Sequence, residues 1–216
     1  LHQQRVALFD KIPVTDRDYL CSRRGQQLAL PLSVNIKEEG VVYQTQGKGI
    51  GRANYEEIRS DYPWLCEQKR PMVTSLDLDG LVSAMFMQSS MGWRLVGFYD
   101  AQHLWIETNT DFLSGDVVFV DHDIHRRQIP SIGHHVLQWQ ADVPVPEHER
   151  SLNPNLIRGI TVNSTFSEKY PFGTIHFLMA CFAAWYPEKR QALKRLPSAF
   201  LPVLLHIDSS FQSAFT

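Results

Sequence analysis

The chain has 216 residues, of which 44% are hydrophobic and 20% are charged, as in an ordinary soluble globular protein. Its net charge of −2 gives no overall electrostatic attraction to nucleic acid, and no apolar run approaches the roughly 18 residues of a membrane-spanning helix. Three scattered cysteines favour a reducing, cytoplasmic compartment over a disulfide framework. The composition therefore excludes a membrane-spanning protein and leaves soluble enzymes and binding modules open.

Residues 1–70 are weakly patterned and are expected to form an N-terminal extension of uncertain fold. A strand is predicted at 40–45 and a helix at 53–59, with Asn54 as its N-cap. The glycine-rich stretch 46–52 fails the spacing of a phosphate-binding loop and predicts a flexible basic loop. Because the chain begins without Met and ends abruptly, we expect it to be a fragment.

An alternation of strands and helices begins near residue 71 and predicts an α/β domain over 71–216, with a mainly parallel sheet flanked by helices. The apolar run 117–120 is typical of a strand that is buried on both faces. The segment 141–155, rich in Pro and Glu, is predicted to be a surface connection. Strands are predicted at 72–76, 94–99, 116–120 and 135–139. Helices are predicted at 79–90, 173–185 and 188–196.

Acidic residues and histidines follow several of these predicted strands. Asp77 and Asp79 follow the first strand, and Asp79 is predicted to cap the next helix, with Gly80 allowing a sharp turn. Because the carboxyl ends of parallel strands meet at one edge of the sheet, residues that follow the strands could converge there. The candidates after the later strands are Asp100, Asp121, His122, Asp123, His134, His135 and Asp208.

A convergent set of carboxylates and imidazoles predicts a metal site. Two neighbouring carboxylates repel each other, and a divalent cation is the simplest way to keep both ionised. Oxygen and nitrogen ligands together select Mn²⁺, Zn²⁺ or Fe over Mg²⁺ and Ca²⁺. A single Asp after a strand is more often a helix cap or a turn residue, so the prediction depends on the whole set. The expected metal ligands are Asp77, Asp79, Asp100, Asp121, His122, Asp123 and Asp208, and the residues expected to act in catalysis are His122, His134 and His135.

On these motifs the chain resembles the DHH phosphoesterase family, which includes RecJ-type exonucleases, nanoRNases, cyclic-dinucleotide phosphodiesterases and inorganic pyrophosphatases. Asp77-Leu78-Asp79-Gly80 is similar to the family's first motif, and Asp121-His122-Asp123 to a later metal motif. Leu152-Asn153-Pro154, the helix start at Gly173-Thr174 and the stretch His206-Ile207-Asp208 are similar to further motifs, in the family's order. The resemblance covers about residues 70 to 216 and implies a DHH-like core that binds one or two Mn²⁺ ions, with Mg²⁺ as the alternative. The smaller C-terminal substrate domain of the family is expected to be missing.

The chain also departs from the family's pattern. An additional His or Asp usually stands upstream in the first motif, where this chain has Ser75 or Val73. Two alignments of the family's naming motif remain open. The preferred one makes Asp121-His122-Asp123 the variant motif, preceded by Asp100 as a single Asp, because it preserves Asp-His after a strand. The other makes Asp121 the single Asp and Gly133-His134-His135 the variant, which loses a metal ligand at Gly133.

The resemblance implies a metal-dependent phosphoesterase that hydrolyses phosphodiester bonds of nucleic acid or short oligonucleotides. In both alignments His134 or His135 is expected near the site, and Gly173 is expected to permit a close approach to it. One alternative is a catalytically degenerate domain that serves as a binding or assembly module, with a protein partner or as a homo-oligomer. Another alternative is a pyrophosphate or polyphosphate hydrolase.

Overall fold

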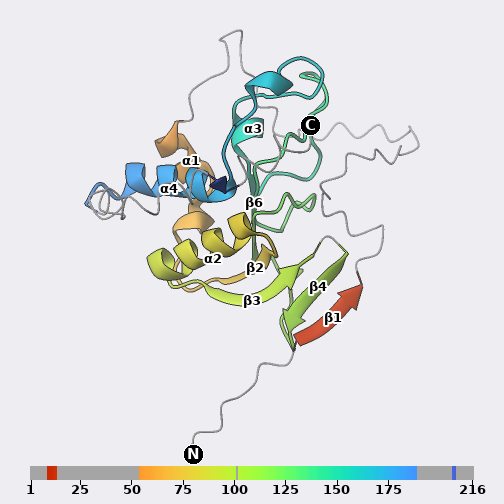
Figure 1. The fold of residues 1–216 in the computed structure, drawn as a ribbon, viewed down its shortest axis with the longest axis vertical. Helices are drawn as coiled ribbons and strands as arrows, with labels where there is room; N and C mark the ends of the chain where they lie inside the picture. The colour runs from red at the N-terminus through yellow and green to blue at the C-terminus, as the bar shows by residue number, and fades with distance from the viewer. Residues whose placement is uncertain (1–8, 14–53, 101, 189–205, 208–216) are drawn as a thin grey trace, which may run out of the picture.

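The computed structural model describes residues 9–13, 54–100, 102–188 and 206–207 (Figure 1). The predicted strand at 40–45, the basic loop at 46–52 and Asp208 lie outside the described residues, as does nearly all of the predicted helix at 188–196. Among the described residues, no helix is both long and apolar enough to cross a bilayer. Cys66 and Cys181 carry free thiols.

A mixed, mostly parallel sheet of seven strands forms the centre of the described fold (Figure 1). Five strands in the middle and at one end run parallel, and the two strands at the other end add an antiparallel edge. The α/β class and the mainly parallel sheet are therefore confirmed. In spatial order the strands are β1 (Phe9–Pro13), β4 (His103–Glu107), β3 (Arg94–Tyr99), β2 (Pro71–Ser75), β5 (Val118–Val120), β6 (Ser131–Ile132) and β7 (Ser151–Leu152).

The strand β5 is shorter than predicted, because the carbonyl of its predicted first residue, Asp116, binds the side chain of Arg70 and not a neighbouring strand. The guanidinium of Arg70 donates hydrogen bonds to the carbonyl of Asp116, at 2.7 Å from Nη2 and 3.1 Å from Nε. The three residues that remain in β5 are buried and pair in parallel with β2, and Phe119 and Val120 also pair in parallel with β6. The prediction of a strand buried on both faces is therefore confirmed, with a start two residues later than expected.

Two sequence predictions between β5 and α3 are wrong. No strand forms at 135–139, where only Gln138 makes an isolated bridge, to Thr161. The carbonyl of His135 accepts a hydrogen bond from the Asn153 side chain at 3.0 Å. The carbonyls of Gln138 and Trp139 accept from the amides of Val162 and Asn163, so this backbone finds partners without a regular strand. The segment 141–155 is not wholly a surface connection, because its end forms the buried strand β7, which pairs with β6.

Four α-helices and two short 3₁₀ turns accompany the described sheet. The helix α1 starts after Asn54, whose side chain accepts hydrogen bonds from the amides of Glu56 and Glu57, as predicted. The helix α2 ends at Gly92, which adopts a left-handed conformation with φ of +68°. The helices are α1 (Tyr55–Asp61), α2 (Leu78–Met91), α3 (Pro154–Ile157) and α4 (Thr174–Trp185), and the 3₁₀ turns are η1 (Pro63–Cys66) and η2 (Phe166–Glu168).

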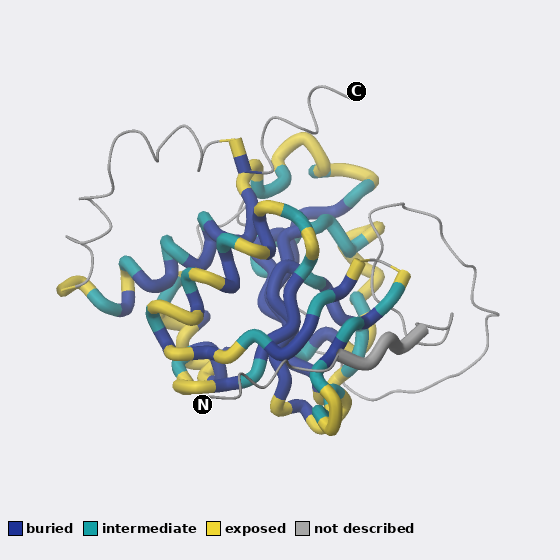
Figure 2. The backbone as a smooth tube through the Cα atoms, turned by 60° about the horizontal axis from the view of Figure 1, so that its bottom comes forward, coloured by how far each residue is buried: buried dark blue, intermediate teal, exposed yellow. Residues whose placement is uncertain are grey.

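The two faces of the sheet are covered differently. On one face, α1, α2 and α4 pack together in a large apolar core, in which Phe86 of α2 meets Phe182 of α4 at a ring distance of 5.2 Å (Figure 1). On the other face, loop residues including Ile124 and Ile129 complete a smaller core. Figure 2 shows the central strands buried between these two layers. Within the described ranges, the helices therefore pack on one face of the sheet. The sequence predicted helices flanking the sheet but did not predict which face they would cover.

Candidate metal centre

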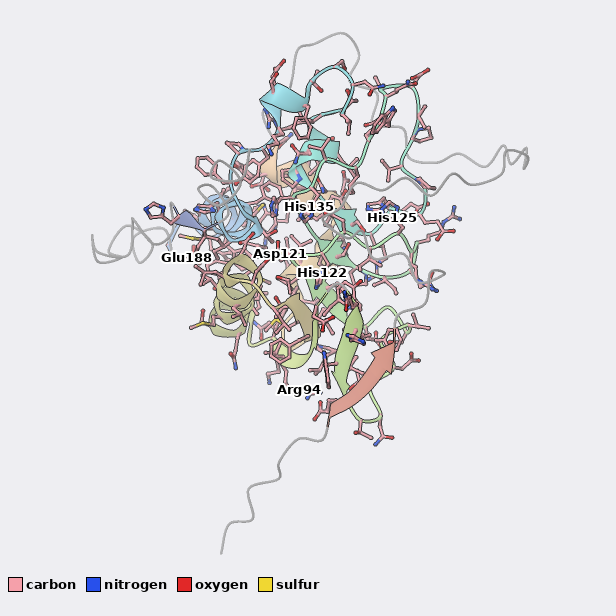
Figure 3. The ribbon with its side chains drawn as sticks, turned by 45° about the vertical axis from the view of Figure 1, so that its right-hand side comes forward. Arg94, Asp121, His122, His125, His135 and Glu188 are labelled. Carbon is pink, nitrogen blue, oxygen red and sulfur yellow. The ribbon has the colours of Figure 1, made fainter. Side chains whose placement is uncertain are left out.

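Three parallel strands that lie side by side end at the candidate site. The order β2-β5-β6 places the residues after each strand next to one another, and these residues include Asp77 and Asp79, Asp121, and His134. Figure 3 shows Asp121 near the middle of the molecule. The first residue of α4, Thr174, reaches the same place from far along the chain. The expected convergence at the carboxyl edge of the sheet is therefore found.

Asp79, Asp121 and His134 form a buried group that could hold a metal ion. One ligand atom from each residue lies within 4.8 Å of the other two. The Nδ1 atom of His134 lies 3.4 Å from Asp121 Oδ1 and 3.7 Å from Asp79 Oδ2. The side chains of both carboxylates are only 2% exposed, so a cation between them would be shielded from water.

Asp77 caps α2, and the prediction that Asp79 does so is wrong. Asp77 has an extended backbone, and its carboxylate accepts a hydrogen bond from the Gly80 amide at 3.0 Å. Asp79 consequently lies inside the first turn and faces the protein interior. Its carboxylate accepts hydrogen bonds from the amides of Thr174 at 2.6 Å and Ile175 at 3.0 Å, which are the first amides of α4.

Gly173 permits this contact between Asp79 and α4. A Cβ atom at Gly173 would lie 2.5 Å from Asp79 Oδ2 and 2.7 Å from Asp79 Cγ, well inside van der Waals contact. The close approach expected at Gly173 is therefore present. Gly80 has a comparable role, because a Cβ atom there would overlap the hydroxyl of Ser75.

Asp121 adopts a left-handed backbone conformation, with φ of +59°, directly after β5. Its Oδ2 accepts a hydrogen bond from the Ser75 hydroxyl at 2.7 Å, and its Oδ1 accepts one from the Thr174 hydroxyl at 2.8 Å. The Thr174 oxygen also lies 3.0 Å from His134 Nδ1. Because Thr174 donates its single hydroxyl proton to Asp121, Nδ1 of His134 carries the proton of that contact when no cation is bound.

The two carboxylates differ in proton affinity. Burial, together with the negative charge of Asp121, raises the pKa of Asp79 to about 7. Burial would also raise the pKa of Asp121, but hydrogen bonding to His134, the charge of His134 and the Ser75 hydroxyl together bring it below its ordinary value. Asp121 therefore stays ionised, whereas Asp79 takes up a proton as the pH falls below about 7, and an incoming cation would displace that proton.

Ser75, at the position where the resemblance leads one to expect a further His or Asp, connects two acidic residues. Its hydroxyl oxygen lies 2.8 Å from Asp77 Oδ1 and 2.7 Å from Asp121 Oδ2. The residue therefore links the end of β2 to the end of β5 through side chains.

The other expected site residues lie around this group in different roles. The Asp100 carboxylate accepts hydrogen bonds from the amides of Gln102 and His103, so the structure uses it in the turn between β3 and β4. The ring of His122 packs against Tyr99 at 5.2 Å, and burial lowers its pKa. Asp123 accepts a hydrogen bond from His135, whose ring stacks on that of His134 at 4.7 Å.

No role at the site was predicted for three polar residues that organise it, although two of them, Asn153 and Thr174, lie in the motifs named above. Thr174 supplies both an amide to Asp79 and a hydroxyl to Asp121. Asn153 donates to Asp123, and Asn155 donates to the carbonyl of His134 at 2.5 Å. A signal for Thr174 exists, because a Gly-Thr pair at a helix start offers a free amide and a hydroxyl close together.

Comparisons of the chain with protein-family models, with curated proteins and with solved structures found no match. What the chain does is therefore inferred from the chemistry of its own residues.

Proposed function

We propose that the chain is a metal-dependent phosphoesterase that hydrolyses phosphodiester bonds of nucleic acid or short oligonucleotides. The observation that carries the proposal is the buried group of Asp79, Asp121 and His134 at the carboxyl edge of a parallel sheet. Two buried carboxylates and an imidazole suit Mn²⁺, with Mg²⁺ as the alternative, and such a cation lowers the pKa of a bound water and balances phosphoryl charge.

One ion fits the described residues better than two. The group offers three ligand atoms for a single cation. The Ser75 hydroxyl stands between the carboxylates of Asp77 and Asp121, and Asp77 also accepts from the Gly80 amide. Asp77 is therefore occupied with holding the start of α2.

The resemblance to the DHH phosphoesterase family supports the same proposal. Asp121 and His134 contribute to one group, which favours the alignment in which Asp121 is the single Asp and Gly133-His134-His135 is the variant motif. That choice reverses the preference expressed from the sequence, where Asp121-His122-Asp123 kept the motif's Asp-His pair. The proposal assigns Asp79, Asp121 and His134 to the cation.

Titration calorimetry with Mn²⁺ tests the metal site. We expect the chain to bind about one Mn²⁺ with a micromolar dissociation constant, and Asp121→Asn and Asp79→Asn to weaken binding by about tenfold or more. Asp116→Asn is the matched control, because Asp116 is exposed and lies before β5 rather than after it. The proposal is wrong if the chain does not bind Mn²⁺, or if Asp121→Asn binds it as tightly as the unaltered chain.

Turnover of three substrates tests the reaction. A short oligonucleotide, a dinucleotide and pyrophosphate are each incubated with the Mn²⁺-loaded chain. Faster release of mononucleotides than of phosphate from pyrophosphate supports the phosphodiesterase. A preference for pyrophosphate instead supports a pyrophosphate or polyphosphate hydrolase.

A catalytically degenerate binding or assembly module is the second candidate, and one observation favours it. The site carboxylates already accept hydrogen bonds from the chain itself, from Ser75 and Thr174 on Asp121 and from two amides on Asp79. Gly133 offers no ligand. Mn²⁺ binding without turnover of any of the three substrates would support this module, with a protein partner or a second copy of the chain.

A further inference from the structure

Asp123 has a fully buried carboxylate that binds both the ring and the backbone amide of His135. Its Oδ2 accepts hydrogen bonds from His135 Nδ1 at 2.8 Å and from the His135 amide at 3.3 Å. Its Oδ1 accepts a hydrogen bond from Asn153 Nδ2 at 2.7 Å. The side chain of Asp123 has no exposed surface, and the same Asn153 amide group also donates to the His135 carbonyl at 3.0 Å.

This arrangement fixes the proton position on the His135 ring. An ionised carboxylate can only accept hydrogen bonds, so the contact at 2.8 Å requires a proton on His135 Nδ1. In the neutral imidazole, Nε2 then carries a lone pair and no proton. Nε2 of His135 is buried and has no hydrogen-bond partner among the described residues. A buried acceptor without a donor is costly, which points to a donor supplied by a bound molecule.

His135 lies beside the metal group. Its ring stacks on the His134 ring with centroids 4.7 Å apart and planes 25° apart, and His134 belongs to the group with Asp79 and Asp121. Figure 3 shows His135 and Asp121 in the same central region of the molecule. The His135 ring therefore lies against a residue of the metal group.

Gly133 shows how closely the Asp123 carboxylate is fitted to its place. A Cβ atom at Gly133 would overlap all three atoms of that carboxylate. The carboxylate of Asp123 therefore fills the space that a side chain at position 133 would take. A side chain at position 133 and the Asp123 carboxylate cannot occupy the same space, so the absence of a ligand at Gly133 goes together with the buried acid at Asp123.

We propose that Asp123 is a positioning residue that holds His135 ready to accept a proton from the attacking water, an inference that rests on the proposed phosphoesterase function. The water oxygen forms a bond to phosphorus while its proton passes to His135 Nε2. The bond from phosphorus to the leaving oxygen breaks, and that oxygen takes a proton from solvent. The carboxylate of Asp123 balances the positive charge that develops on the ring of His135.

The proton position on His135 is measured first, in the unaltered metal-free chain at slightly alkaline pH. Long-range ¹H–¹⁵N NMR separates a protonated ring nitrogen from an unprotonated one, and His135→Gln identifies the signal by its loss. We expect Nδ1 to be protonated and Nε2 to be unprotonated. In Asp123→Asn the carboxamide can donate as well as accept, so we expect the Nε2-protonated form to appear. An unaltered chain with Nε2 protonated overturns the proposal, whether or not the variant folds.

Kinetics of oligonucleotide hydrolysis are measured next. For Asp123→Asn we expect kcat to fall by about 10²- to 10⁴-fold, with KM and the Mn²⁺ dissociation constant within about threefold of the unaltered chain. Asp111→Asn is the control, because Asp111 is an exposed acid that binds the Leu113 amide within a surface turn. Unchanged kcat in Asp123→Asn, or a loss that lies wholly in KM or in Mn²⁺ affinity, overturns the proposal.

The two proposals fail in different ways. If the Mn²⁺-loaded unaltered chain hydrolyses none of the substrates, the proposed phosphoesterase function is wrong. The proposed role of His135 as proton acceptor is then wrong as well. The NMR measurement still decides whether Asp123 controls the His135 ring. If the unaltered chain is active and Asp123→Asn is equally active, only the inference about Asp123 is wrong.

Discussion

At the scale of single residues, glycines without side chains let the acids of the site lie close to the backbone. Gly173 makes room for the Asp79 carboxylate, Gly133 for that of Asp123, and Gly80 for the Ser75 hydroxyl. Each of these polar groups then reaches hydrogen-bond partners that it would lose if a methyl group displaced it. The geometry of the site therefore depends on the lack of a side chain at Gly173, Gly133 and Gly80 as much as on the metal ligands themselves.

Gly173→Ala tests this dependence. The added methyl group would lie 2.5 Å from Asp79 Oδ2, so we expect the free energy of unfolding to fall by about 1–3 kcal/mol and Mn²⁺ affinity to fall by about tenfold. Urea denaturation and calorimetry measure the two effects.

Gly92→Ala is the matched control for that variant. Gly92 adopts φ of +68° at the far end of α2, and a methyl group there would meet nothing closer than Lys69 Cγ at 3.7 Å. We expect backbone strain to lower the free energy of unfolding by about 1 kcal/mol while Mn²⁺ affinity stays unchanged. Equal losses of Mn²⁺ affinity in both variants would show that lost stability, not the displaced Asp79 carboxylate, explains the effect.

The sequence predicted which residues lie at the site, but not which contacts each of them makes there. Asp79, Asp121 and His134 were all named as candidates, because acids and histidines after strands share one sheet edge. The roles of Asp77 and Asp79 were exchanged, since a helix start one residue earlier changes which carboxylate faces the interior. The sequence could not reveal Thr174 as the shared donor, because its contact with Asp79 spans 95 residues.

At the scale of elements, the short helix α3 matters more for its cap than for its length. Asn153 caps it by accepting from the amides of Asn155 and Leu156, and with its remaining donor group it holds Asp123 and the His135 carbonyl. The next polar residue, Asn155, holds the His134 carbonyl. A one-turn helix thereby fixes the backbone of both neighbouring histidines.

A comparison of two helix caps tests this role. Asn54→Ala removes an exposed cap of α1, and we expect the free energy of unfolding to fall by about 1 kcal/mol. Asn153→Ala removes a buried cap and leaves Asp123 short of a donor, so we expect a fall of about 3 kcal/mol. Denaturant titration measures both. Equal effects would mean that the additional hydrogen bonds of Asn153 contribute nothing.

Elements with strong local signals were predicted well, and elements defined by distant partners were not. The strand β3 matches its prediction at both ends, and the helices α2 and α4 match theirs to within a residue or so. The apolar pattern of 135–139 predicted a strand, but the carbonyls of this segment bind scattered partners: the Asn153 side chain at His135, and the amides of Val162 and Asn163 at Gln138 and Trp139. The strands β6 and β7 contain two residues each, too few for a periodic pattern to show.

At the scale of the whole molecule, buried ionisable groups outside the metal group link stability to pH. Burial, with the nearby charge of His148, lowers the pKa of His125 to about 4, and burial also lowers the pKa of His148. The two rings meet at a centroid distance of 4.2 Å. In the unfolded chain both histidines take up protons near pH 6.5, whereas in the folded chain they do not.

The contribution of His125 to stability should therefore fall as the pH drops from about 6.5 towards 4. Over this range the unfolded state binds a proton at His125 that the folded state lacks, which gives a slope of about 1.4 kcal/mol per pH unit for one group. Asp79 contributes in the opposite direction between about pH 4 and 7, because over this range the folded state binds a proton at Asp79 that the unfolded state lacks. We expect His125→Gln to show a shallower acid loss in urea titrations at pH 4.5, 5.5 and 6.5. A slope equal to that of the unaltered chain would contradict the assignment for His125.

The hydrogen bonds of Thr174 join residues that are 95 and 53 positions apart in the chain. We expect such distant contacts to form late in folding, because closing long loops costs entropy before any contact is gained. We therefore expect the ligand group to take its final shape when α4 docks against the sheet. A cation that recognises this group would bind the native state and not its precursors, so it would slow unfolding without guiding the early steps of folding.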